Sequence, residues 1–163
     1  MKRRDFIQKT AASSALLGLT GVSLSSFSTP SDIKKITILH TNDVHSHIDP
    51  FPADHPKNPN LGGAARRAAI IEGIRKEEKN VLLLDAGDIF QGTPYFNYYG
   101  GELEFKLMSM MKYDLATMGN HDFDNGIDGF YAQLPHANFE FVSANYDFRN
   151  TELDGIVKPY KTF

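Results

Sequence analysis

The sequence predicts an α/β fold in which βαβ units form a mostly parallel sheet. Short apolar segments typical of strands alternate with longer segments in which apolar residues recur at helical spacing. The alternation runs from residue 36 to residue 146, and each strand segment leads into polar residues. A length of 163 residues is consistent with one domain.

Four segments have the composition expected of strands. Residues 36–40 (ITILH) form a short run rich in β-branched side chains. Residues 81–88 (VLLLDAGD) begin with a continuous apolar run, which is typical of a strand covered on both faces. Residues 114–118 (DLATM) and 139–146 (FEFVSANY) are the expected third and fourth strands.

Helices are predicted between these strands. In residues 62–79, apolar side chains recur every three or four positions from Ala64 to Ile74, and charged residues end the segment, which indicates an amphipathic helix. Residues 100–112 form a second predicted helix. Residues 127–134 form a short third helix that a proline ends.

Residues 1–30 have the pattern of an export signal. Arg3 and Arg4 precede a mildly apolar run diluted by serine and glycine, and the basic start resembles a bacterial twin-arginine signal. An ordinary general-secretion signal is the alternative. Cleavage near Ser28 is expected, although an uncleaved N-terminal anchor also fits the pattern. The sequence therefore predicts contact with the export machinery and a periplasmic or extracellular location for residues 31–163.

The composition excludes several classes of function. Cysteine is absent, so disulfides and thiolate chemistry are excluded and a metal would need oxygen or nitrogen ligands. The formal net charge of −3 argues against binding to a nucleic-acid polymer. After residue 30 no segment approaches the ~20 consecutive apolar residues of a membrane span.

Polar side chains follow every predicted strand. Because the carboxyl ends of parallel strands meet at one edge of a sheet, we expect these side chains to lie together. Carboxylates and imidazoles without a thiol suit divalent ions such as Mn²⁺, Zn²⁺ or Fe²⁺. Crowded carboxylates repel one another unless cations lie between them, so two ions that share a bridging carboxylate are expected. The side chains concerned are Asp43, His45, His47, Asp85, Asp88, Asn120, His121, Asp122, Asp124 and Asn145.

Three motifs resemble those of the calcineurin-like metallophosphoesterases: LHTNDVHSH at 39–47, LLLDAGD at 82–88 and TMGNHDFD at 117–124. The further stretches GGAARRAAII, GDIFQGTP and FVSANY resemble the 5′-nucleotidase branch, whose members hydrolyse nucleotides and related phosphoesters. The similarity covers roughly residues 36–160. The fold that it implies is about half of a four-layer α/β/β/α sandwich.

The resemblance also implies a ligand set for two divalent ions, Mn, Zn or similar. Asp43 and His45 would bind the first ion, Asp88 would bridge both ions, and Asn120 would bind the second. Such ions lower the pKa of a bound water toward ~7, and the resulting hydroxide would attack the phosphoester.

A catalytic pair completes the implied site. His121, oriented by Asp124, would stabilise the transition state and assist the departing alcohol, since a protonated imidazole held by a carboxylate places positive charge there. The implied function is an exported hydrolase that releases phosphate from nucleotides or other small phosphoesters. Hydrolysis of 2′,3′-cyclic nucleotides or UDP-sugars, and thiosulfohydrolase activity, are alternatives on the same scaffold.

The sequence departs from the family in one respect. Family members add further histidines that complete both metal shells and a C-terminal domain that binds the nucleoside, and neither is in this sequence. We therefore expect residues 31–163 to be a truncated N-terminal portion of the catalytic domain, with uncovered apolar surface and little or no turnover by itself. An inactive fragment that binds a partner is the non-enzymatic alternative.

Other residues receive structural interpretations. We favour loop hydrogen bonds for Asp85 and Asp122, because Asp after or near glycine is a common turn residue. The roles of His47 and Asn145 are left open. The aromatic stretch at 94–99 (PYFNYY) is interpreted as ordinary packing rather than as a surface for base stacking.

Overall fold

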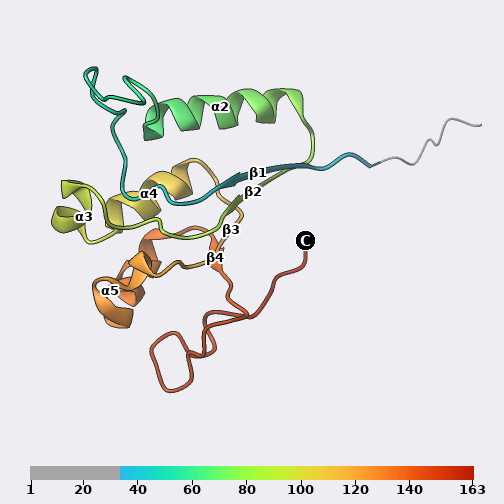
Figure 1. Cartoon of the computed structure of the whole chain (residues 1–163). Helices are drawn as coiled ribbons and strands as arrows, with labels where there is room; N and C mark the ends of the chain where they lie inside the picture. Colours follow the sequence, from blue (N-terminus) through green and yellow to red (C-terminus); the bar gives the residue numbers. More distant parts are fainter. Residues whose placement is uncertain (1–33) are drawn as a thin grey trace, which may run out of the picture. The chain divides into compact units, whose positions relative to one another are not determined.

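Four parallel strands form the centre of the computed structural model, which describes residues 34–163 (Figure 1). The strands lie in sequence order, so each βαβ connection leads to the neighbouring strand. This arrangement confirms the predicted parallel α/β sheet. The export signal predicted at residues 1–30 lies outside the described residues. The strands are β1 (Thr37–Thr41), β2 (Val81–Asp85), β3 (Leu115–Ala116) and β4 (Glu140–Phe141).

The helices agree with the prediction except in one region. The helix predicted over 100–112 is confirmed with slightly shorter bounds, at Glu102–Met110, and a further short helix that the sequence does not predict precedes it at Pro94–Tyr99. Gly100 and Gly101 both have left-handed backbone angles, with φ of 62° and 106°, which a continuing helix excludes. The helices are α2 (Ala64–Glu77), α3 (Pro94–Tyr99), α4 (Glu102–Met110) and α5 (Gly126–Gln133), with 3₁₀ turns at His121–Phe123 and Leu134–His136.

The third and fourth strands are shorter than the sequence predicts. Only two residues pair in each, and after β4 the chain makes an isolated bridge from Val142 to Lys158. The Ser143 hydroxyl lies 3.1 Å from the Asn145 side-chain oxygen and accepts a bond from the Tyr146 N–H. Such local side-chain bonds compete with the ladder of a sheet, which explains why the predicted strand stops early.

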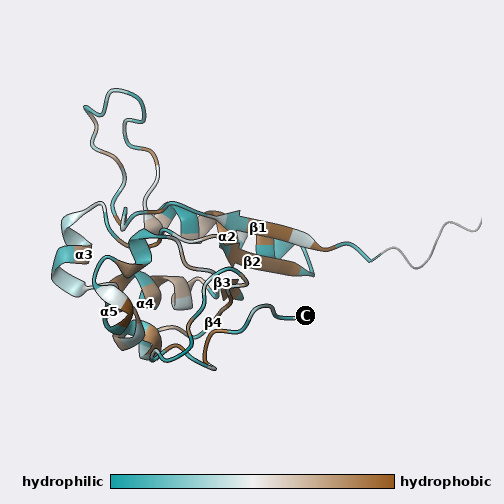
Figure 2. Cartoon of the chain, turned by 60° about the horizontal axis from the view of Figure 1, so that its bottom comes forward, coloured by the Kyte–Doolittle hydropathy of each residue, from teal (hydrophilic) through white to brown (hydrophobic). Residues whose placement is uncertain are grey.

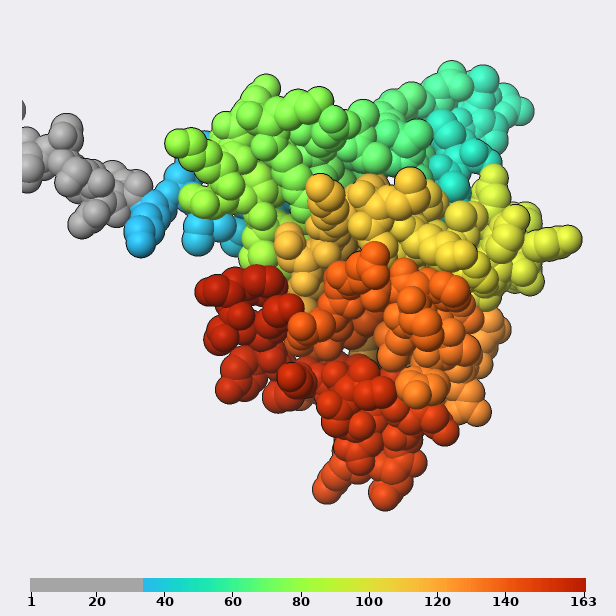
Figure 3. Space-filling model, turned by 180° about the vertical axis from the view of Figure 1, so that it is seen from behind, coloured from blue at the N-terminus to red at the C-terminus, as the bar shows by residue number. Residues whose placement is uncertain are grey.

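Helices cover one face of the sheet. Right-handed connections that step in one direction along a parallel sheet place their helices on the same side. Figure 3, seen from behind, shows the surfaces of α2 (green), α4 (gold) and α5 (orange) lying next to one another. Alternation along β1 and β2 turns Leu39 and Leu83 toward this side, and Leu83 is buried.

Phenylalanine side chains form the core between the sheet and the helices. Phe105 and Phe130 are fully buried, and their ring centroids lie 5.6 Å apart. Phe90, from the loop after β2, packs at 4.9 Å from Phe105. Phe141 of β4 lies 5.0 Å from Phe130. Because Phe90 belongs to the core, the loop that carries the predicted ligand Asp88 is fixed by packing two residues further on.

Exposed apolar residues lie at the start of β1, on the side opposite Leu39. Ile36 and Ile38 are 65% and 63% exposed. Figure 2 shows hydrophobic residues along β1 and β2. Among the helices of residues 34–163, none is long and apolar enough to cross a membrane.

A buried carboxylate on α4 and a partly buried guanidinium on α2 line the same small cavity. Glu104 is 3% exposed, and neither of its carboxylate oxygens has a hydrogen-bond partner within residues 34–163. The Nε atom of Arg67 is also buried without a partner there. Both residues line one cavity of about 10 Å³. Burying charged groups with incomplete pairing is unfavourable, so this pair is a weak point of the core.

Replacing both charges together, by Arg67→Met and Glu104→Leu, is expected to raise the free energy of unfolding by about 1–4 kcal/mol, because no buried charge then remains unpaired. Glu104→Leu alone should be less stable than the double variant, since it removes one of the carboxylates near the Arg67 charge and leaves Asp85 as the other. Urea denaturation of the three proteins measures both differences. A double variant less stable than the unmodified protein would contradict this account.

Candidate metal centre

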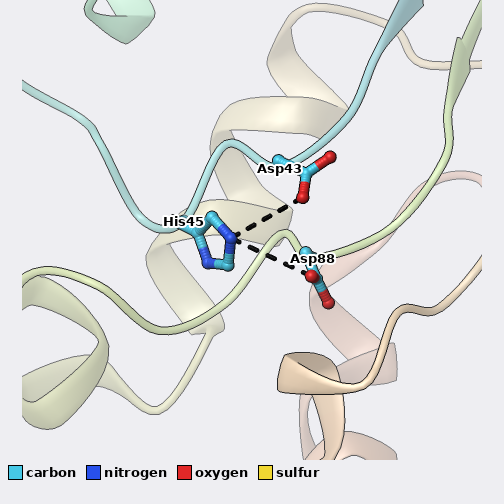
Figure 4. A group of neighbouring side chains, drawn as sticks. All are labelled: Asp43, His45 and Asp88. Carbon is cyan, nitrogen blue, oxygen red and sulfur yellow. Dashed lines mark ion pairs between the residues drawn. The ribbon is translucent and has the colours of Figure 1, made fainter.

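The loops after β1 and β2 bring three predicted ligands together (Figure 4). Asp43 and His45 follow β1, and Asp88 follows β2. Their ligand atoms all lie within 4.8 Å of one another. His45 Nε2 lies 3.8 Å from Asp43 Oδ1 and 3.9 Å from Asp88 Oδ2. Two atoms each about 2.1 Å from one ion lie roughly 3–4 Å apart, so the group has the spacing of a metal site.

The hydrogen bonding of His45 also fits a metal ligand. Its Nδ1 lies 3.2 Å from the carbonyl oxygen of Phe90, which can only accept. Nδ1 therefore carries a proton, and in the neutral ring the lone pair of Nε2 would face the two carboxylates. A backbone carbonyl that holds the second ring nitrogen is a common support for metal-binding histidines.

Several residues of these loops adopt the left-handed backbone conformation. Asp43, His45 and Ser46 have φ of 51°, 49° and 53°, and Asp88 and Gln91 have φ of 55° and 66°. Each such residue other than glycine costs about 1–2 kcal/mol of local strain. Backbone strain of this kind persists where surrounding contacts fix the conformation, and it clusters at functional sites.

Asp122 supplies the contacts that fix the loop after β2. Its side chain is buried and accepts four backbone N–H bonds, at 2.8–3.0 Å, two to each carboxylate oxygen. Burial raises the pKa of Asp122, and the four N–H donors oppose this by stabilising its charged form. The favoured structural role of Asp122 is therefore confirmed. The donors are Asp88, Ile89, Phe90 and Gly119.

Asp85 also has the favoured structural role. It is 5% exposed, and its carboxylate accepts bonds from the Thr41 hydroxyl at 2.5 Å and the Gly87 N–H at 2.9 Å. Burial raises its pKa to about 6, against the opposing effect of these two donors. Asp85 therefore joins the ends of β1 and β2 beneath the metal centre.

The loop after β3 lies directly against Asp88. The His121 N–H donates to Asp88 Oδ1 at 3.0 Å. A Cβ atom at Gly119 would lie only 2.0 Å from the same oxygen, so only glycine fits there. Asn120 lies between these two contacts and is exposed. No hydrogen bond among the described residues fixes its side chain, so its role as a ligand stays a prediction.

The predicted pair is present in the same loop. His121 Nδ1 lies 3.1 Å from Asp124 Oδ2. This bond raises the pKa of His121 and lowers that of Asp124, because each partner stabilises the charged form of the other. The ring of His121 lies 5.2 Å from that of His45, edge to face. The pair is therefore next to the metal ligands.

The two residues with open roles lie differently. His47 packs against Phe51 with ring centroids 4.7 Å apart, while Asn145 is exposed and its side chain is hydrogen-bonded to the Ser143 hydroxyl.

The packing interpretation of residues 94–99 is correct for Phe96, which is buried, and wrong for Tyr98 and Tyr99, which are 86% and 46% exposed. A helix as short as α3 can bury only one side of its aromatic residues.

The fold and the site define an α/β protein with a candidate carboxylate–imidazole metal site at the carboxyl ends of parallel strands. The family model "Calcineurin-like phosphoesterase" matches residues 36–163. The chain therefore belongs to the calcineurin-like phosphoesterase family.

Its relatives include 5′-nucleotidases. The chain is 42% identical over 134 residues to snake venom 5′-nucleotidase of Crotalus adamanteus, covering 78% of the chain and 23% of that protein. It is 42% identical over 135 residues to the 5′-nucleotidase of Homo sapiens, covering 78% and 24%. The chain thus spans about a quarter of the length of these curated relatives.

Two solved structures share the fold. The crystal structure of a 5′-nucleotidase precursor from Thermus thermophilus has a TM-score of 0.70 and 41% identity, covering 77% of this chain and 25% of that one. The NAD nucleotidase of Haemophilus influenzae has a TM-score of 0.71 and 33% identity, covering 78% and 26%.

The replacement Asp122→Asn is expected to lower the free energy of unfolding by about 2–4 kcal/mol, because the amide nitrogen would face N–H groups that need an acceptor. Urea denaturation measures the loss. Asp54→Asn, at an exposed position, is the matched control and should stay within about 0.5 kcal/mol of the unmodified protein. Equal stability of the two variants would contradict the role given to Asp122.

Asp85 is expected to make stability depend on pH. Its pKa of about 6 exceeds the ordinary value of 3.8, so between these values the folded state holds a proton that the unfolded state releases. Its contribution to stability is present below pH 4 and is lost as pH rises through 6. The difference of about two pKa units corresponds to about 3 kcal/mol.

Unfolding measured at pH 4, 5, 6 and 7 tests this dependence. Asp85→Asn cannot titrate, so the stability of the unmodified protein should fall relative to that of the variant across this range. Parallel curves for the two proteins would show that Asp85 does not titrate in this window.

Proposed function

We propose that the protein is a metal-dependent phosphoester hydrolase of the 5′-nucleotidase type. The convergence of Asp43, His45 and Asp88 from two strand ends is the observation that carries this proposal. The 5′-nucleotidase relatives support it from sequence. In this role Asp43, His45, Asp88 and Asn120 hold two divalent ions, Mn, Zn or similar.

The orientation of Asp88 suits a bridging ligand. Its Oδ2 faces His45 and the loop after β1, while its Oδ1 faces His121 and the loop after β3. A single carboxylate thus reaches toward both groups of ligands. When bound, the ions supply Lewis acidity and activate water as the nucleophile.

His121 serves the departing alcohol. Its Nδ1 is bonded to Asp124, which leaves Nε2 free to hold a proton toward the oxygen that leaves phosphorus. The pKa of His121 is raised above its ordinary value, chiefly by the bond to Asp124, which favours the protonated ring. The His121–Asp124 pair therefore provides the positive charge and the proton that this step needs.

The substrate class follows from the relatives. Their names include nucleotidases that act on 5′-nucleotides and a nucleotidase that acts on NAD. We propose a nucleotide as the substrate, with AMP as the first to assay. We also propose export to the periplasm or outside the cell, which the basic start at Lys2, Arg3 and Arg4 supports.

The test is release of inorganic phosphate from AMP by the full-length protein with added Mn²⁺. Asp88→Asn should lower the rate at least about 100-fold, because the bridging carboxylate is lost. Asp128→Asn, at an exposed position of α5, is the matched control and should keep the rate. Equal rates in Asp88→Asn and the unmodified protein would refute the proposed function.

Metal binding is measured separately by titration calorimetry with Mn²⁺. The unmodified protein should bind the ion, and Asp88→Asn should bind it more weakly. Release of nicotinamide mononucleotide from NAD, assayed in parallel, distinguishes a preference for the dinucleotide. A folded protein that binds no divalent ion would exclude the metal centre.

A further inference from the structure

Gln91 connects the loop after β2 to the pair His121–Asp124. Its Nε2 donates to Asp124 Oδ2 at 3.0 Å, the same oxygen that lies 3.1 Å from His121 Nδ1. Its Oε1 accepts the Gly92 N–H at 2.9 Å. Both ends of the amide are therefore engaged, and the side chain has one defined orientation.

The backbone of Gln91 adopts a strained conformation. Its φ of 66° lies in the left-handed region, which glycine adopts far more readily. A glycine at this position would relieve the strain but would lack the amide. The conformation is compatible with the packing on either side, since Phe90 is buried in the core and Gly92 lies against His45.

Asp124 depends on this amide for its orientation. It is an exposed residue whose carboxylate accepts bonds from His121 and Gln91, both at Oδ2. Asp124 follows the 3₁₀ turn His121–Phe123, so it belongs to the same short segment as the histidine. Of these two hydrogen bonds, the one from Gln91 connects the Asp124 carboxylate to another loop, the loop after β2 that also carries Asp88.

We propose that Gln91 is the positioning residue of the His121–Asp124 pair. By fixing Asp124 Oδ2, it fixes the acceptor for His121 Nδ1–H and thereby the tautomer and direction of the ring. The catalytic part of this inference rests on the proposed function. The geometric part, the effect on His121, stands on the hydrogen bonds alone.

The test is the variant Gln91→Gly, which removes the amide and suits the left-handed backbone. Asn150→Gly is the matched control, because Asn150 also has a left-handed backbone, with φ of 63°, and is exposed in a loop without predicted site residues. Both variants are expected to remain folded, with urea denaturation measuring how the relieved strain compares with the loss of the two hydrogen bonds of the Gln91 amide. This removes loss of folding as an explanation for any change in function.

Two readouts follow the pair itself. In ¹⁵N NMR, the neutral His121 ring should be predominantly the Nδ1–H tautomer in the unmodified protein and in Asn150→Gly, and a mixture of tautomers in Gln91→Gly. With AMP and Mn²⁺, Gln91→Gly should lower kcat about 10–100-fold with little change in KM.

A double variant shows whether Gln91 acts through Asp124. In an Asp124→Ala background, the further change Gln91→Gly should leave kcat unaltered, because the group that Gln91 positions is already absent. Additive losses would overturn the proposal. An unchanged tautomer and an unchanged kcat in Gln91→Gly would overturn it as well.

Failure of the proposed function has a different signature. If the unmodified protein releases no phosphate from AMP or NAD, but Gln91→Gly still mixes the tautomers of His121, the positioning role is supported and the hydrolase is not. If the hydrolase is active and neither the tautomer nor kcat responds to Gln91→Gly, the hydrolase is supported and the positioning role fails.

Discussion

The carboxylate of Asp122 is the constraint on which the site depends. It is buried, and it accepts hydrogen bonds from four backbone N–H groups in the loops after β2 and β3. Because one of these donors is the N–H of Asp88 itself, the bond fixes the backbone from which that ligand projects. The strained conformations of Asp88 and Gln91 are maintained against this anchor and against the packing of Phe90.

The candidate site therefore consists of exposed side chains that are supported by buried residues. Beneath it, Asp85 joins the ends of β1 and β2, and the phenylalanine core holds the loop after β2 from below. Above it, Asp43, His45 and His121 are partly or largely exposed. Solvation explains why the buried Asp122 and the exposed Asp43 differ. A buried carboxylate needs hydrogen-bond donors at fixed positions, whereas an exposed one is solvated and remains available to a cation.

Much of this arrangement could be predicted from the sequence. Alternating patterns indicated the parallel sheet, and the polar residues after each strand indicated where a site forms. The short helix α3, the early end of β4 and the contacts of Gln91 were not predicted. They depend on backbone angles and on side-chain bonds between loops far apart in sequence, which periodicity does not encode. The GDIFQGTP stretch contained Gln91, but nothing local distinguishes it from a solvated amide.

All four hydrogen bonds to the Asp122 carboxylate come from backbone N–H groups. Peptide N–H groups are supplied by every residue except proline, so the hydrogen bonds themselves do not require particular side chains at the donor positions, although Ile89 and Phe90 are also constrained by burial in the core. Gly87 and Gly119 are exceptions, because any Cβ there would collide with the facing backbone or with Asp88. The hydrogen bonds that hold the loop of Asp88 therefore depend on backbone N–H groups and on Asp122 itself, and not on the chemical type of the donor residues' side chains.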